Sequence, residues 1–99
     1  MRENKFQAHV VKRLRAEHRG CVVVKNDSAY LQGIPDLSFY IGRFWGMLEV
    51  KADLLAPLQP NQQYYVNLFN LMSFCRIICP QNEEEVFDEI QRALAGFDR

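Results

Sequence analysis

Apolar segments of two different periods divide this chain into seven expected elements, and their order limits the folds open to it. Phe6, Val10, Val11 and Leu14 recur at helical spacing, which predicts one apolar stripe on a helix over Glu3–His18. The other expected elements are strands over Cys21–Val24, Leu37–Ile41, Met47–Lys51 and Phe74–Cys79, and helices from Pro60 to Ser73 and over Glu83–Leu94. This order predicts an α/β fold with a mixed four-stranded sheet flanked by helices and a C-terminal helix.

Length and composition predict one compact domain over residues 1–99. The chain has 99 residues, 48% of them apolar, which argues against intrinsic disorder. No apolar run approaches the ~20 residues that span a bilayer, and the charged start does not resemble a signal peptide. We therefore expect a soluble, cytoplasmic protein without a membrane partner, and the small, self-contained form suggests a phage or prophage source.

The cysteines and histidines show no metal-binding spacing. Cys21, Cys75 and Cys79 are odd in number and include no C-x-x-C pair, so we expect buried free thiols in a reducing compartment. His9 and His18 are not spaced to complete a zinc site, and we expect both on a helix surface.

Charge is distributed unevenly although the net charge is zero. Residues 1–51 hold nine Lys and Arg against five Asp and Glu, whereas residues 52–99 hold three against seven. A basic face could be formed by Arg2, Lys5, Lys12, Arg13, Arg15, Arg19, Lys25 and Arg43. The acidic run Glu83–Glu85 is expected elsewhere. This asymmetry fits contact with a polyanion, but it also fits ordinary solvated helix faces.

Two carboxylates and a lysine are expected to meet across a hairpin. Asp36 lies where a loop enters the second strand, and Gly42–Gly46 is expected to connect that strand to the third. Glu49 and Lys51 then share one face of the third strand. With the carbonyl of Val50, these carboxylates offer the hard oxygen ligands that Mg²⁺ or Mn²⁺ prefers.

Such a site could hydrolyse a phosphodiester. The metal would lower the pKa of a bound water, and Lys51 would orient that water or neutralise developing charge. The alternative is an exposed hairpin whose lysine–carboxylate pair contributes under ~1 kcal/mol to stability.

Three strings carry a family resemblance: G-I-P-D-L at Gly33–Leu37, E-V-K at Glu49–Lys51 and L-Q-P-N-Q at Leu58–Gln62. Together they resemble the PD-(D/E)XK nuclease superfamily, and most closely its stand-alone VRR-NUC (virus-type replication-repair nuclease) domains. The resemblance implies a restriction-endonuclease-like αβββαβ core. The expected element order agrees with it.

The resemblance also implies roles for single residues. Asp36 and Glu49 match the metal-binding acids, Lys51 the catalytic lysine, and Gln62 a supporting glutamine on the following helix. Glu3 matches a first-helix glutamate that joins the metal site, although the helix dipole alone favours an acid there. Gln62 could equally be an ordinary helix-surface glutamine.

By the same resemblance, the protein is a homodimer that cleaves branched DNA, notably Holliday (four-way) junctions. Flaps, single strands or plain duplex are alternative substrates, and a catalytically inactive DNA-binding module is the non-enzymatic alternative. The predicted DNA contacts are Lys5, Lys12, Lys25, Tyr30 and Arg43, with Phe44 and Trp45 on loops near the site but more often packing residues.

Two further features bear on partners. The helix from Pro60 to Ser73 is apolar around most of its circumference, so one side could be covered by a partner subunit. There is no glycine-rich phosphate loop, so we expect no nucleotide cofactor.

Overall fold

The computed structural model describes residues 2–97. Its elements are α1 (Glu3–Glu17), β1 (Val22–Lys25), β2 (Leu37–Ile41), β3 (Phe44–Val50), α2 (Gln62–Met72), β4 (Cys75–Ile78) and α3 (Glu83–Phe97). The predicted element order is confirmed. β2 has the predicted bounds, α1 and α3 begin at the predicted residues, and the other boundaries differ by one to three residues. Most of these differences are the ordinary fraying of element ends.

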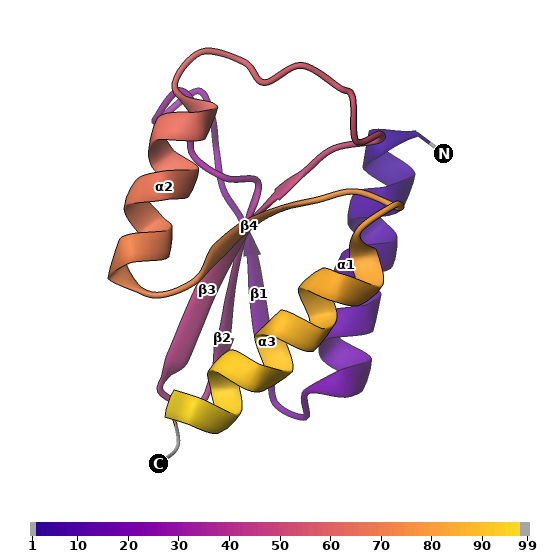
Figure 1. Cartoon of the computed structure of the whole chain (residues 1–99), viewed down its shortest axis with the longest axis vertical. Helices are drawn as coiled ribbons and strands as arrows, with labels where there is room; N and C mark the ends of the chain where they lie inside the picture. Colours follow the sequence, from indigo (N-terminus) through magenta and orange to yellow (C-terminus); the bar gives the residue numbers. More distant parts are fainter. Residues whose placement is uncertain (1, 98–99) are drawn as a thin grey trace.

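The four strands form one mixed sheet in the order β1-β2-β3-β4. β1 pairs with β2, and β2 with β3, in antiparallel fashion, whereas β4 lies parallel to β3. A parallel neighbour requires a crossover connection, which α2 provides between β3 and β4. Figure 1 shows the sheet nearly edge-on, with α2 on one side and with α1 and α3 on the other.

The main core lies between the sheet and the pair α1 and α3. It is formed by Phe6, Val10, Val11, Leu14, Leu37, Phe39, Phe44, Leu48, Val50, Phe74, Ile78, Val86, Phe87 and Ile90. The apolar stripe expected on the first helix supplies four of these residues. Because side chains alternate along a strand, burying Leu48 and Val50 here turns Glu49 and Lys51 to the opposite face, toward α2.

The connection between β2 and β3 is shorter than expected. Gly42 and Arg43 alone form the turn, with Gly42 at φ 60°, and Phe44 pairs with Ile41 in the ladder. The prediction that Phe44 and Trp45 lie on a loop near the site is therefore wrong. Phe44 is buried in the core, and the Trp45 ring packs edge-on against Phe69 of α2. Two glycines flanking an aromatic pair suggested a longer turn than the strands need.

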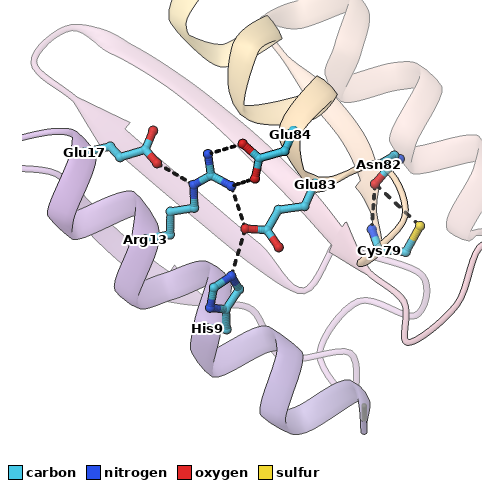
Figure 2. Close-up of polar contacts among 7 residues, drawn as sticks. All are labelled: His9, Arg13, Glu17, Cys79, Asn82, Glu83 and Glu84. Atoms are coloured by element: carbon cyan, nitrogen blue, oxygen red, sulfur yellow. Dashed lines mark hydrogen bonds and ion pairs between the residues drawn. The ribbon is translucent and has the colours of Figure 1, made fainter.

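The acidic run at the start of α3 lies against the basic helix α1, which corrects the expectation that it lies elsewhere. Figure 2 shows the Arg13 guanidinium among the carboxylates of Glu17, Glu83 and Glu84, while His9 Nε2 lies 2.8 Å from Glu83 Oε2. Arg13 also lies 4.1 Å from the centre of the Phe87 ring. Its charge is thus used inside the fold and is removed from the predicted basic face.

The two histidines differ from each other. His9 is exposed, as expected, but His18 is buried at 8% exposure, so its predicted surface position is wrong. His18 follows the last turn of α1, where its backbone N–H donates to the carbonyl of Leu14 and its carbonyl accepts from Cys21. The chain turns sharply toward β1 at this point, and the turn carries the His18 side chain inward.

The three cysteines are free thiols, as predicted. Cys75 and Cys79 are buried as expected, but Cys21 is only half-buried. Asn82 closes the turn after β4, where its Oδ1 accepts from the Cys79 backbone N–H (Figure 2). Its Nδ2 donates to the Ile77 carbonyl. Within residues 2–97, no helix combines the length and apolarity needed to cross a bilayer.

Candidate functional site

Strand register brings Asp36 and Glu49 together. Leu37 pairs with Leu48, so the residue before β2 lies beside the residue after Leu48 on β3. The backbone N–H of Val50 donates to Asp36 Oδ2 at 2.8 Å, which fixes the carboxylate against the β3 backbone. The hairpin therefore brings Asp36 next to Glu49 and Lys51, as their spacing in the sequence predicted.

Gln62 links Glu49 to Lys51 from the first turn of α2. Its Nε2 donates to Glu49 Oε2 at 2.9 Å, and its Oε1 accepts from Lys51 Nζ at 2.9 Å. Lys51 Nζ is also 3.6 Å from Glu49 Oε2. The same Gln62 Oε1 accepts from the Gln59 backbone N–H at 2.6 Å, which holds the amide in this orientation. Gln62 is not an ordinary surface glutamine.

The surroundings of Glu49 disfavour the charged form of its carboxyl group. Its exposure is 1%, and burial together with the nearby Asp36 carboxylate raises its pKa to about 8, against a partly compensating Lys51 ammonium. Glu3, at the exposed start of α1, adds a small effect in the same direction. Glu49 Oε1 is buried without a hydrogen-bond partner. A bound cation is one group that would satisfy this oxygen and relieve the repulsion.

The donor set suits a small, hard cation, although it is sparse. Glu49 Oε1 and the Asp36 carboxylate are carboxylate oxygens, the ligands that Mg²⁺ and Mn²⁺ take together with several waters. No cluster of three or more His, Cys, Asp or Glu suited to a metal occurs in the part of the chain that the structure describes. The predicted participation of Glu3 and of the Val50 carbonyl stays a prediction.

A cleft of about 420 Å³ lies beside Gln62 and is lined by Ser28, Ala29, Gln32, Gly33, Gln59 and Gln62. Its two walls meet where Gly33 (φ 91°) contacts Asn61 (φ 71°). The sequence analysis placed Gln59 and Asn61 in the L-Q-P-N-Q string but predicted neither the Gln59 backbone bond to Gln62 nor the contact of Asn61 with Gly33. The available signal was the enrichment of asparagine and glycine in left-handed backbone, which does not identify contacting pairs.

The predicted DNA contacts separate into two groups. Lys12 and Lys25 line a groove between α1 and β1, and Tyr30 is 91% exposed on the loop that forms one wall of the cleft. Arg43 instead occupies the turn between β2 and β3, at the end of the strands opposite to Asp36. The structure does not bring Arg43 to the candidate site.

Comparison of the chain with protein-family models, with curated proteins and with solved structures finds no match.

Proposed function

We propose that this protein is a metal-dependent endonuclease that hydrolyses phosphodiester bonds with Mg²⁺ or Mn²⁺. One observation carries the proposal: Glu49 is buried next to Asp36, with Oε1 unsatisfied and a lysine on the same strand face. Buried carboxylate oxygens in structural ion pairs usually have hydrogen-bond partners. Clustered carboxylates that raise each other's pKa are typical of functional sites.

Each residue of the site has a proposed role. Asp36 and Glu49 would hold the cation, with the Val50 carbonyl and Glu3 as further candidate ligands. The bound cation would supply charge neutralisation and a more acidic water. Lys51, at 7% exposure, would stabilise the charge that develops on the phosphoryl oxygens. Gln62 would position Lys51 and Glu49 relative to each other through its two hydrogen bonds.

The proposed substrate is structured DNA, in particular a four-way junction. The support is the resemblance of the G-I-P-D-L, E-V-K and L-Q-P-N-Q strings to VRR-NUC domains, together with the α/β sheet whose element order is that of a restriction-endonuclease-like core. On this basis we also propose that the protein has a restriction-endonuclease-like fold. Flaps, single strands and duplex are the competing substrates.

The proposed active form is a homodimer. The face of the sheet toward α2 and the outer side of α2 expose many apolar side chains, and α2 packs mainly on β3 and β4. The exposed apolar residues on these elements are Val22, Val24, Tyr40, Tyr64, Leu71 and Met72. Exposed apolar side chains gathered on one side of the sheet are typical of an interface. Light scattering at micromolar concentration should therefore show a dimer, and an 11.6 kDa species alone would contradict it.

The substrate proposal is tested by a matched panel: a labelled four-way junction, a flap, a single strand and a linear duplex of the same sequence, each with Mn²⁺, with Mg²⁺ and with EDTA. The junction should be cut fastest, and only with metal. If another DNA of the panel is cut faster than the junction, that DNA is the preferred substrate and the junction proposal is wrong. If the protein binds DNA but neither cleaves it nor binds Mn²⁺, the inactive DNA-binding module would be favoured.

A further inference from the structure

A second feature, separate from the carboxylate site, is a groove of about 400 Å³ between α1 and β1. Ala8, Val11 and Val23 form its apolar floor. Lys12, Arg15 and Lys25 complete its lining and place three cationic side chains around that floor. An apolar floor beneath several cations is complementary to a sugar–phosphate chain, in which apolar sugar edges alternate with anions.

The groove cations have no counterions. Among the ion pairs and hydrogen bonds of residues 2–97, none involves the side chain of Lys12, Arg15 or Lys25. Arg13, on the same helix, is instead paired with Glu83 and Glu84. The fold thus neutralises the basic residue that faces α3 and leaves those that face β1 uncompensated.

Helical periodicity extends this basic surface along α1. Lys5, Ala8, Lys12, Arg15 and Arg19 are spaced by three or four residues, so the first four share one face of α1 and Arg19 follows just after its end. From Lys5 to Arg15 this stripe covers about 15 Å of helix at about 1.5 Å per residue.

The groove and the carboxylate site lie at the same end of the sheet but on opposite faces: Lys25 pairs with Leu37, which faces α1, whereas Glu49 faces α2. Lys25 is the last residue of β1, and the next backbone N–H, that of Asn26, donates to the Asp36 carbonyl at 2.8 Å. A strand that runs from the groove to Asp36 would therefore have to pass around the edge strand β1 near Lys25. Arg43 lies at the other end of the sheet and has no part in this path.

We propose that the groove between α1 and β1 binds the sugar–phosphate backbone of a nucleic-acid strand that leaves the carboxylate site, with Lys12, Arg15 and Lys25 contacting successive phosphates. The inference rests on the proposed nuclease function for the identity of the polyanion. It adds Arg15 to the contacts predicted from the sequence, excludes Arg43, and gives the strand a direction along α1.

The test measures binding, without cleavage. Fluorescence anisotropy of a labelled four-way junction, in EDTA and between 50 and 250 mM salt, gives the slope of log K against log salt. Lys12→Gln/Arg15→Gln should reduce the magnitude of that slope by about 1.8, because each lost phosphate contact removes about 0.9. Arg92→Glu is the matched control: it changes net charge by the same two units at an exposed position of α3. Its slope should stay at the wild-type value.

Equal slopes for the double variant and wild type would overturn the inference, as would equal changes in the double variant and in Arg92→Glu. Binding of a polyglutamate peptide that the double variant loses, with no change in DNA binding, would assign the groove to an acidic protein segment and would also overturn it. If the groove-dependent slope is found but wild type cuts no substrate with Mn²⁺, the proposed nuclease function fails and the groove inference stands. Thermal unfolding of each variant checks that it is folded.

Discussion

Gly33 and Asn61 pack so closely that a Cβ on Gly33 would lie 2.6 Å from the Cβ of Asn61. Both residues have left-handed backbone, at φ 91° and 71°. Their contact joins the loop before Asp36 to the residue before Gln62, so it sets the position of two members of the candidate site. The glycine of the G-I-P-D-L string thus has a structural explanation in this chain.

Gly33→Ala should destabilise the protein more than Gly42→Ala does. Both glycines have positive φ, which costs a residue with a Cβ about 1–2 kcal/mol. Only Gly33 adds a steric overlap, whereas a Cβ on Gly42 would meet nothing within 4 Å. We expect Gly33→Ala to lose about 1–3 kcal/mol beyond the loss in Gly42→Ala, measured by urea unfolding. Equal losses would show that the contact with Asn61 yields without cost.

Gln62→Ala should slow cleavage by about 10- to 100-fold, the usual effect of removing a residue that orients metal ligands. The loss should fall on kcat, because Gln62 hydrogen-bonds Glu49 and Lys51, the residues proposed to act on the reacting phosphate. Gln63→Ala is the control, since Gln63 is exposed and bonds Asn67 on its own helix. Matching kcat values for the two variants would rule out the bridging role.

Metal-free protein should lose stability as pH rises from about 4.5 to about 8. Glu49 has a raised pKa in the folded state, so the folded protein holds this proton more tightly than the unfolded chain does. The stabilisation from this Glu49 proton is complete below the pKa of the unfolded chain, about 4.5. It is lost as the pH rises to the folded-state pKa of about 8, by up to about 1.4 kcal/mol per pH unit.

Urea unfolding of wild type and Glu49→Gln in EDTA checks this. Glu49→Gln should be the more stable protein at pH 8, and the difference between the two should shrink toward pH 4.5. Mn²⁺ at pH 8 should stabilise wild type alone. The exposed Glu85→Gln serves as control and should follow wild type. Parallel profiles for wild type and Glu49→Gln would contradict the assignment of the raised pKa to Glu49.

Arg13→Ala should destabilise the packing of α1 on α3 by about 1–2 kcal/mol. The guanidinium contacts the Phe87 ring face and is paired with Glu83 and Glu84, and its removal leaves those carboxylates facing each other. For a chain of this length the melting temperature should fall by about 4–16 °C. Arg13→Lys should recover part of the loss, and high salt should narrow the gap, because Glu84 is exposed. An unchanged melting temperature in Arg13→Ala would contradict a stabilising role for the contacts of Arg13 with α3.

The fold and the centre of the site could be predicted because both depend on local periodicity. Alternation along β3 places Glu49 and Lys51 on one face, and the short hairpin brings Asp36 beside them. Burial of His18 and the pairing of Arg13 with α3 could not be predicted, because they depend on how α1 and α3 meet across the core. The same holds for Asn61, whose left-handed backbone matters only through its contact with Gly33.

Single-turnover cleavage of a labelled four-way junction by wild type and by Glu49→Gln, with and without Mn²⁺, tests the central claim most directly. Wild type should give products only with metal, and Glu49→Gln, which keeps the shape of the side chain, should be slower by at least about 100-fold, in line with loss of a metal-ligand oxygen. Absence of products from wild type on the junction and on every other substrate of the panel, or equal rates for the two proteins, would contradict the assignment of Asp36, Glu49 and Lys51 as a metal-dependent nuclease site.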